Sequence, residues 1–431
     1  MNKFFCNIPW THYTMRPNGY IRVCCFANQG PTNGILIKDD GSPYTYKDKI
    51  SESRNCKLLK DIRVSLLNNK WHPECIRCER EYNSGSEKTR LIMLKKKNRN
   101  FSREDAIIET HPDGSIDTNQ VPILHYDLRL GNKCNLRCRM CYATDSDGWY
   151  QDLYKIYGQT SFMDIGREIK VIEKDGKYVA EKDPYHWFDE DIFWDNLKEY
   201  IHTIKSMYIV GGEPMLISKH FDFLEGCDNS KNIEVAYNTN LTVVPNKGIN
   251  IWKKFKNVHF GVSIDGHDKV NEYIRHPSKW DIIERNFKRL AYNKNFSLDI
   301  STTISVFNIL RFIDIIKWSA DNIKNKIIPF NPHPLHAPPF YNIRSFPVKS
   351  KLIIEQTLSK QIMGMKNDGY SNEIINIAKQ FANYYISFMN QEHIKGDVKL
   401  FWEINDKMDY YRNQKMSEYI PELIKLIPRE I

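Results

Sequence analysis

The feature that most limits the possible folds of this chain is a regular succession of strand-like and helix-like segments between residues 123 and about 335. Strands that alternate with helices pair in parallel and bind ligands at their carboxyl ends. We therefore expect an α/β fold, an incomplete (β/α)6 TIM-like barrel. The six strand-like runs are ILHYDLRL (123–130), SMYIVGG (206–212), IEVAYNT (233–239), VHFGVSI (258–264), LDISTTIS (298–305) and KIIPFNP (326–332).

Helical patterns occupy the spaces between the later runs. They cover residues 246–257, 280–293 and 308–322. In the second of these, Trp280, Ile283, Phe287 and Leu290 recur at helical spacing and predict one buried face.

The sequence on either side of this core has a different character. Residues 1–94 are rich in cysteine and predict a small domain with one amphipathic helix over 51–69, whose buried face is Leu58, Leu59, Ile62 and Leu66. Residues 95–122 are polar and predict a linker. The core domain is expected over 123–340, and residues 341–431 predict a helical region with helices near 351–365, 372–390 and 400–413.

Composition narrows the class of protein. The chain has 431 residues, 41% of them apolar, and lacks the run of about 18 apolar residues that a membrane helix needs. A cytoplasmic protein without a membrane partner is expected. Its ten cysteines are then metal ligands or thiols rather than disulfides. The net charge of +9 is modest, and KKKNRN (95–100) predicts a solvated stretch rather than a nucleic-acid site.

Three cysteines follow the first core strand in the motif GNKCNLRCRMCYA (131–143). Cys134, Cys138 and Cys141 have the spacing C-x3-C-x2-C, with no fourth cysteine nearby. Zinc sites and iron-sulfur clusters held only by protein usually have four ligands, so this motif predicts a metal centre with an open position. A zinc site or unrelated thiols is the alternative.

The strand, the cysteine motif and the barrel-like succession together resemble the radical S-adenosylmethionine (SAM) superfamily. The resemblance implies that Cys134, Cys138 and Cys141 hold three irons of a 4Fe-4S cluster, whose fourth iron binds SAM. It also implies reductive cleavage of SAM to methionine and a 5'-deoxyadenosyl radical, which abstracts a hydrogen atom from the substrate. The electron would come from a reductant protein of flavodoxin or ferredoxin type.

The same resemblance assigns further residues to SAM. Gly211, Gly212, Glu213 and Pro214 match the element that receives the SAM amino group, for which a close backbone approach and a carboxylate are suited. A simple turn is the alternative. The other residues that match SAM-lining positions are Ser263 and Asp265 after the fourth strand, Asn240, Arg275 and Met140. A methionine replaces the aromatic residue that the family often has near the adenine, and structural roles remain open for the others.

A second set of cysteines lies near the N-terminus. Cys6 and Cys24 occur in C-x12-G-x4-C, and Cys75 and Cys78 form C-x2-C. The set resembles SPASM or Twitch domains, which implies an auxiliary 4Fe-4S cluster, here placed before the core. A zinc site is the alternative, and Cys25 could replace Cys24.

The remaining cysteines have weaker claims to function. Cys56 is expected to be buried, and Cys227 falls near the opposite end of the barrel from SAM. No catalytic acid, base or hydrogen donor can be named.

The chain is therefore expected to be an enzyme, of oxidoreductase or peptide-modifying type. The resemblance favours a peptide or protein substrate, with a small molecule such as a carbohydrate or nucleotide as the alternative. Two other classes remain open, a zinc-containing nucleic-acid-binding protein and a fold that binds clusters without catalysis.

Overall fold

The computed structural model describes residues 2–85, 101–323 and 327–429. The stretch KKKNRN and the expected boundary near residue 94 lie outside these ranges. The chain forms two compact units. The first comprises Met1–Lys133, Asp183–Tyr237 and Pro245–His259, and the second Cys134–Lys182, Asn238–Val244 and Phe260–Ile431. Each unit is assembled from separate stretches of the sequence and does not correspond to one continuous domain. The domain boundaries expected from the sequence therefore remain predictions.

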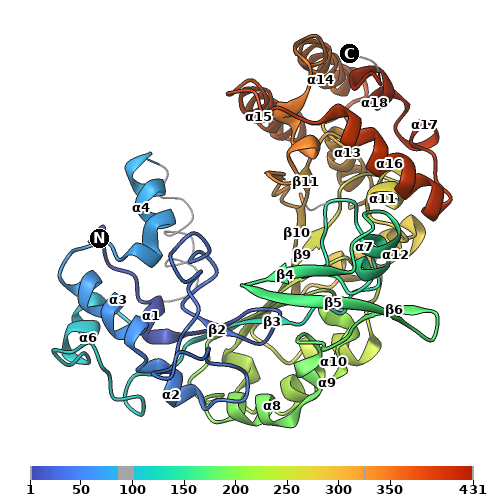
Figure 1. Ribbon diagram of the computed structural model, residues 1–431. Coiled ribbons are helices and arrows are strands. Elements are labelled where there is room, and N and C mark those ends of the chain that lie inside the picture. The colour runs from blue at the N-terminus through green and yellow to red at the C-terminus, as the bar shows by residue number, and fades with distance from the viewer. Residues whose placement is uncertain (1, 86–100, 324–326, 430–431) are drawn as a thin grey trace. The chain divides into compact units, whose positions relative to one another are not determined.

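The first unit is built on a mostly parallel sheet, as the sequence predicts (Figure 1). Strands β1 and β3 pair in parallel, as do β3 and β7 and then β7 and β8, while β2 is antiparallel to β1. The strand order is β2–β1–β3–β7–β8, followed by β9. Strand β1, which the sequence analysis did not foresee, extends the sheet beyond the first core strand. The bounds are β1 (His12–Met15), β2 (Ile21–Arg22), β3 (His125–Leu130), β7 (Ser206–Gly211), β8 (Glu234–Thr239) and β9 (Asn257–Ser263).

The two faces of this sheet differ in character. In β3 the apolar residues Tyr126, Leu128 and Leu130 alternate with polar ones and are fully buried. The Tyr126 hydroxyl donates a hydrogen bond of 2.7 Å to the carbonyl of Leu197, so this face packs against helices. Figure 1 shows these helices along one side of the strands. They are α8 (Asp191–Lys198), α9 (Ser218–Glu225) and α10 (Asn246–Trp252).

The N-terminal helix predicted over 51–69 is wrong in one respect, because the structure has two helices there. They are α2 (Ile50–Arg54) and α3 (Lys57–Leu67). Cys56 has extended backbone angles, and the Asn55 side chain exchanges hydrogen bonds of 2.9 and 3.0 Å with the backbone of Ile116. An asparagine side chain that binds backbone groups competes with helix formation, which explains the break.

The described part of the predicted linker has structure of its own. Residues 103–108 form α6 (Arg103–Ile108), which begins at a capping box made by Ser102 and Asp105. The buried Arg63 guanidinium donates to the carbonyls of Pro9 and Gly114, so this segment is bound to the N-terminal helices. The other N-terminal helices are α1 (Ile8–Thr11) and α4 (Ile76–Asn83).

The second unit contains the end of β9 together with β10 (Phe296–Ser301), and the short parallel pair β11 (Thr303–Ile304) and β12 (His333–Pro334). Of the sixth predicted strand, 326–332, the structure describes residues 327–332. This part is largely not a regular strand and makes one parallel bridge, between Phe330 and Ile300. Two prolines, Pro329 and Pro332, remove backbone donors there and limit the ladder.

Within the described residues, the second unit also has four helices before its C-terminal region, of which α12 packs on β10. The predicted buried face of α12 is confirmed, because Trp280, Ile283, Phe287 and Leu290 are all buried. The helices are α7 (Trp149–Lys155), α11 (Lys269–Ile274), α12 (Trp280–Ala291) and α13 (Phe312–Asn322).

The second unit also contains an antiparallel sheet that the sequence analysis missed. Its strands are β4 (Ser161–Asp164), β5 (Arg167–Lys174) and β6 (Lys177–Ala180), in that order. Asp175 and Gly176 join the last two strands with φ angles of 51° and 72°. Two consecutive residues with positive φ make a tight hairpin turn, for which Asp-Gly is a preferred sequence.

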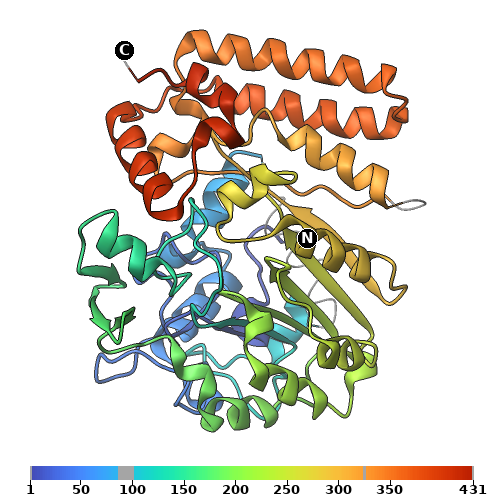
Figure 2. The same ribbon diagram turned by 90° about the vertical axis from the view of Figure 1, so that its right-hand side faces the viewer.

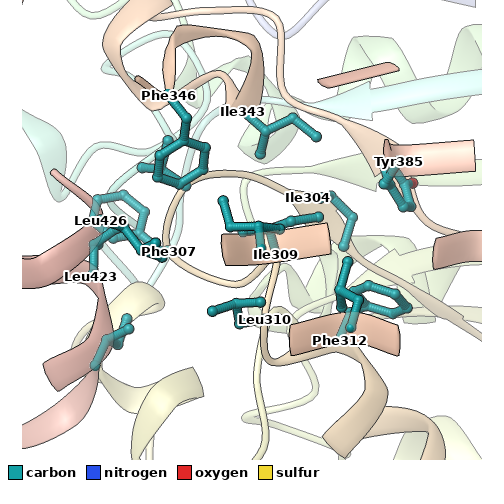
Figure 3. Close-up of a cluster of buried hydrophobic side chains, with 14 of the residues drawn as sticks. Ile304, Phe307, Ile309, Leu310, Phe312, Ile343, Phe346, Tyr385, Leu423 and Leu426 are labelled. Atoms are coloured by element: carbon teal, nitrogen blue, oxygen red, sulfur yellow. The ribbon is translucent and has the colours of Figure 1, made fainter. Parts of the chain in front are cut away.

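The C-terminal region is helical, and Figure 2 shows its two longest helices side by side. Figure 3 shows the buried apolar cluster of this unit, in which Phe307, Ile309 and Phe312 pack with Tyr385 and Leu423. The helices are α14 (Val348–Asn367), α15 (Asn372–Met389), α16 (Val398–Arg412), α17 (Met416–Tyr419) and α18 (Pro421–Leu426). In the described part of the chain, no helix has both the length and the apolar character required to cross a bilayer.

Short 3-10 helices complete the structure. They are η1 (Pro73–Cys75), η2 (His186–Asp189), η3 (Pro214–Leu216), η4 (Ser230–Asn232), η5 (Pro339–Tyr341) and η6 (Ile343–Ser345).

Candidate functional site

The three cysteines of the C-x3-C-x2-C motif lie on one loop between β3 and α7. Cys138 is buried, and Cys134 and Cys141 are half-buried. The backbone N–H of Cys134 donates to the Asp147 carboxylate at 3.0 Å, and that of Cys141 donates to the carbonyl of Cys138 at 3.0 Å. The backbone of the loop is thus fixed at both ends of the motif.

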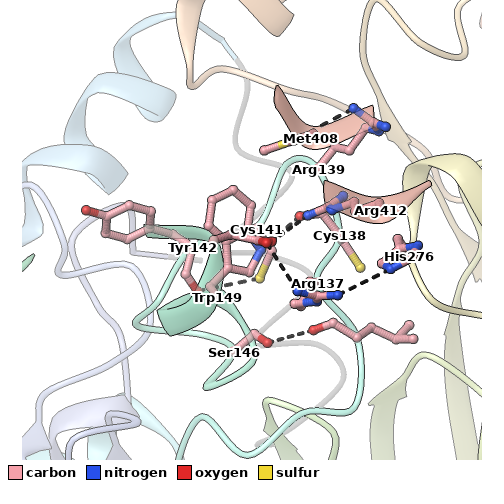
Figure 4. A network of polar contacts seen from close by, with 12 residues as sticks. Arg137, Cys138, Arg139, Cys141, Tyr142, Ser146, Trp149, His276, Met408 and Arg412 are labelled. Carbon is pink, nitrogen blue, oxygen red and sulfur yellow. Dashed lines mark hydrogen bonds and ion pairs between the residues drawn. The ribbon is translucent and has the colours of Figure 1, made fainter. Parts of the chain in front are cut away.

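The two arginines beside Cys138 attach this loop to the end of α11 and the residues that follow it. The N–H of Arg137 donates to the carbonyl of His276 at 2.6 Å, and the N–H of Arg139 donates to the carbonyl of Ile274 at 2.8 Å. Figure 4 shows Cys138 between these two arginines and their side chains in a larger polar network. Both backbone and side chains therefore hold the middle cysteine in place.

Asp152 of α7 is the buried acid of this network. Its carboxylate receives Arg137 at 3.2 Å and Arg412, from the end of α16, at 2.6 Å. The side chains of Asp152 and Arg412 are 2% and 0% exposed. A buried ion pair of this kind costs much to break, because the remaining charge has no partner.

Arg139 connects the loop to the middle of α16. Its guanidinium donates to the Asn405 side chain at 2.9 Å, pairs with Asp409, and lies 3.7 Å above the ring of Tyr273. Its side chain is 0% exposed. The C-terminal helices, for which the sequence suggested no role, thus help to position the cysteine loop.

The environment of Cys138 and Cys141 favours their protonated form. Burial raises the pKa of Cys138, and the nearby Arg275 guanidinium acts against this effect. Burial, with Asp145 and Cys138 next in importance, raises the pKa of Cys141 well above its ordinary value. Metal ligation requires thiolates, so loading of this site would release protons.

The GGEP element is held against the backbone that leads into the cysteine loop. The N–H of Gly212 donates to the carbonyl of Gly131 at 3.2 Å, and the N–H of Glu213 donates to that of Lys133 at 2.8 Å. A Cβ on Gly212 would stand 2.3 Å from the carbonyl oxygen of Lys133, so only glycine fits. Lys133 directly precedes Cys134 in the sequence.

Gly211 has a backbone conformation that favours glycine, and Glu213 caps a short helix. Gly211 has a φ of +151°, and a Cβ there would meet the carbonyl oxygen of Leu130 at 2.6 Å. The fully buried Glu213 carboxylate accepts the N–H of Met215 at 3.1 Å, and Pro214 begins the short helix η3. Glu213 is therefore an N-cap in this structure.

Asn240, just after β8, is in contact with the cysteine loop. Its side-chain amide donates to the Sγ of Cys134 at 3.8 Å and to the Asn135 side chain at 3.1 Å. Its oxygen accepts the N–H and hydroxyl of Thr242. The structure thus brings Asn240 together with one predicted metal ligand.

Asp265 and Arg275 form a buried ion pair beside Cys138. Their closest atoms, Nε and Oδ2, are 2.6 Å apart, and Asp265 also accepts the N–H of Thr303 at 2.7 Å. Burial works to lower the pKa of Arg275, but the charges of Asp265 and Cys138 outweigh it and raise that pKa.

The other two predicted residues of this unit are less closely connected to the cysteines. Ser263 ends β9 and is half-buried. Met140 packs against the apolar cluster of the C-terminal helices.

The four N-terminal cysteines line one apolar pocket in the first unit. Cys6, Cys24, Cys75 and Cys78 contribute to it, together with Phe26 and Trp71, and Cys25 is not among its lining residues. Burial, and then Cys24, Cys6 and Cys78, raise the pKa of Cys75 well above its ordinary value. Among the residues that the structure describes, no three His, Cys, Asp or Glu side chains converge closely enough to hold a single metal ion.

Glu74 fixes the wall of this pocket. Its carboxylate is 2% exposed and accepts hydrogen bonds from the N–H and hydroxyl of Thr32 and from the N–H of Gly34, at 2.7 to 2.9 Å. The remaining two cysteines are buried elsewhere, and burial raises the pKa of Cys227 to about 12.

Sequence reasoning missed the polar network around the cysteine loop. Arg137, Arg139, Asp152 and Arg412 carry no family motif, although two arginines that flank a cysteine are a visible signal. His276 was missed as well. Burial, followed by Arg412 and Arg137, lowers its pKa to about 3, so its imidazole is neutral near pH 7.

Comparisons with known proteins support the resemblance to the radical SAM superfamily that the sequence motifs indicate. Residues 128–318 match the model of the Radical SAM superfamily. A curated relative, "Uncharacterized protein MJ0907" of Methanocaldococcus jannaschii, is 25% identical over 205 residues, which are 45% of this chain. The match spans 57% of that protein's length.

Two solved structures are similar to this chain at low identity. Streptococcus suis SuiB bound to its precursor peptide SuiA is 14% identical, with a TM-score of 0.34, over 82% of this chain and 71% of that one. Native anSMEcpe with bound AdoMet and a Cp18Cys peptide is 13% identical, with a TM-score of 0.34, over 57% of this chain and 60% of that one. At these scores the likenesses carry no argument about this chain.

The first prediction concerns the buried acid. Replacing Asp152 with Asn should lower the free energy of unfolding by about 3–5 kcal/mol, because Arg137 and Arg412 would lose their carboxylate partner. Urea denaturation measures the change. The control is Glu403→Gln on α16, whose ion pair with Lys407 is exposed and should change stability by less than about 0.5 kcal/mol. Equal effects of the two changes would contradict the assignment.

The second prediction concerns the close backbone approach. Gly212→Ala should destabilise the protein by about 1–3 kcal/mol and weaken SAM binding, because the new Cβ displaces the backbone before Cys134. Denaturation and calorimetric titration of SAM would measure the two effects. Gly364→Ala in α14 is the control, since a Cβ there meets no atom within 4 Å. If the Gly212→Ala variant bound SAM with native affinity, a role of this close backbone approach in SAM binding would be excluded.

Proposed function

We propose that this chain, through the radical SAM domain over residues 128–318, is an enzyme that reductively cleaves SAM and modifies a substrate by hydrogen abstraction. The observation that supports this most directly is the fixed loop that carries Cys134, Cys138 and Cys141. When bound there, a 4Fe-4S cluster and SAM would supply the electron transfer and the 5'-deoxyadenosyl radical.

The donor set fits such a cluster. Three thiols project from one loop whose backbone is held by hydrogen bonds on both sides of Cys138. The Asn240 amide donates to the Sγ of Cys134, and a donor of this kind stabilises a thiolate ligand. The Arg275 charge beside Cys138 lowers the cost of ionising that thiol.

The protein's own groups would bind SAM in the following way. The GGEP strand end would approach SAM through its backbone, with the Glu213 carboxylate facing the amino group. Ser263, Asp265, Asn240, Arg275 and Met140 would line the rest of the cosubstrate. Because Asp265 already pairs with Arg275, we expect this pair to act as one rigid polar unit.

We further propose that Cys6, Cys24, Cys75 and Cys78 hold an auxiliary 4Fe-4S cluster of SPASM or Twitch type. All four line one pocket, which supports this, and the absence of Cys25 from the residues lining that pocket favours Cys24 over Cys25 as the ligand. Four protein ligands would complete the coordination of a cluster, so its expected role is electron transfer. A flavodoxin or ferredoxin in a reducing cytoplasm would be the electron donor.

The proposed substrate is a peptide or protein side chain. This follows from the resemblance of the N-terminal cysteines to SPASM and Twitch domains, which occur in enzymes that modify peptides. If peptides fail to react, the alternative substrate is a small molecule, such as a carbohydrate or nucleotide.

The third prediction tests the SAM cluster. Cys138→Ala should abolish the release of 5'-deoxyadenosine from reconstituted, dithionite-reduced protein, because the loop would retain only two thiol ligands. Chromatography of the reaction measures the product, and Cys227→Ala is the control, since this buried thiol belongs to neither proposed cluster and donates to the carbonyl of Phe223 in α9. Production at the native rate by the Cys138 variant would refute the catalytic assignment.

The fourth prediction tests the auxiliary cluster. The double change Cys75→Ala and Cys78→Ala should remove about half of the bound iron, if two equal clusters are present. Iron and sulfide analysis after anaerobic reconstitution measures the loss, and Cys25→Ala should leave the content unchanged. Zinc in place of iron, or no loss in the double variant, would exclude this cluster.

A further inference from the structure

An apolar cavity lies in the second unit, where β10, α13, α15 and residues 327–330 meet. Its volume is about 300 Å³, which is within the range of sites that bind small molecules. Seven of its eleven lining residues are isoleucines, among them Ile300 of β10, Ile316 of α13 and Ile374 of α15. The wall of this cavity is therefore mostly branched aliphatic.

The cavity lies on the face of β10 that packs against helices. Ile300 lines it and is buried, whereas the side chain of the preceding residue, Asp299, points to the opposite face of the strand. A Cβ on Gly261 would meet the Oδ1 of Asp299 at 3.4 Å, so Asp299 lies on the face that Gly261 and Ser263 share in β9. The layer of strands thus separates the cavity from the face on which we place SAM.

Ser319 is a buried polar group in the wall of the cavity. It is 6% exposed, and among the described residues its hydroxyl has no hydrogen-bond partner. Serines within helices commonly donate to the carbonyl four residues earlier, as Ser359 does to Glu355 at 2.9 Å. A buried hydroxyl without a partner is costly unless a molecule in the cavity supplies one.

Water is poorly suited to fill this cavity. A buried water needs about two to four polar partners, and the side chains that line the cavity offer only the hydroxyls of Ser319 and Ser371. Ser371 already accepts the N–H of Ile374 at 3.4 Å as the cap of α15. An apolar molecule would therefore displace weakly held water, and a single polar group on it would satisfy Ser319.

The lining residues indicate that this molecule is uncharged. None of them is a lysine, arginine, aspartate or glutamate. The N-terminus of α15, which could attract an anion, is already complemented by the Ser371 cap and by Glu373 in its first turn. A charged group in the cavity would lose its hydration without gaining a partner.

We propose that this cavity is a binding site for a small, neutral aliphatic molecule with one hydroxyl or carbonyl group, which forms a hydrogen bond with Ser319. The inference goes beyond the proposed function and does not depend on it. No residue that we assign to SAM or to either cluster lines the cavity.

The test is calorimetric titration of the anaerobically reconstituted, full-length protein with 1-hexanol, sodium hexanoate and hexylammonium chloride. Native protein should bind 1-hexanol saturably and the two charged probes at least about tenfold more weakly, because the cavity offers no ionic partner. Ser319→Ala should weaken 1-hexanol binding about fivefold, the effect expected for one hydrogen bond. Ser359→Ala is the matched control and should bind like the native protein, since its hydroxyl is already bonded within α14.

A second variant tests the location without removing a polar group. Ala320 lines the cavity, so Ala320→Leu should occupy part of it and abolish 1-hexanol binding, while thermal denaturation shows no loss of stability. Absence of saturable binding to native protein would overturn the inference, as would native affinity in either cavity variant. Equal or tighter binding of a charged probe would overturn it too. None of these measurements requires SAM cleavage.

Discussion

The buried carboxylate of Asp152 is the interaction on which the geometry of the cysteine loop depends. Its negative charge compensates Arg137, which lies in the cysteine motif, and Arg412, which is 260 residues after Asp152 in the sequence. Arg412 is fully shielded from water and Arg137 largely so, so the loss of this carboxylate would be costly. The pairing makes the loop a rigid part of its unit, as a ligand-binding loop must be if its thiols are to keep their spacing.

A second constraint acts through the backbone alone. Gly211 and Gly212 allow the end of β7 to approach the carbonyls of Leu130 and Lys133 more closely than any side chain permits. Polar groups attach the cysteine loop to its own unit, and the glycines bring the GGEP backbone to the residue before Cys134. The consequence is that loss of a polar side chain such as Asp152 should act mainly on stability, whereas a change at Gly212 should act on both stability and SAM binding.

Short-range patterns explain why part of the fold and site could be predicted. The cysteine spacing, GGEP after a strand, and the apolar repeat of α12 are each visible within about 15 residues. The polar network could not be predicted from the sequence, because Arg139 and Asp409 are 270 positions apart and no sequence rule pairs residues at such a separation. The break before Cys56 depends on Asn55 binding Ile116, 61 residues away. The hairpin around Asp175 and Gly176 carried a local signal that was overlooked.

Each proposed thiolate site has a buried arginine beside it. Arg275 lies near Cys138, and Arg22 lies near Cys24. Burial alone would keep these thiols protonated, so a nearby cation reduces the cost of forming the ligand, and the metal supplies the remainder. The two arginines differ in their own partners, because Asp265 neutralises Arg275 whereas Arg22 shares its surroundings with Arg16 and Arg129. The same physical role, lowering the cost of thiolate formation, thus falls to Arg275 and to Arg22.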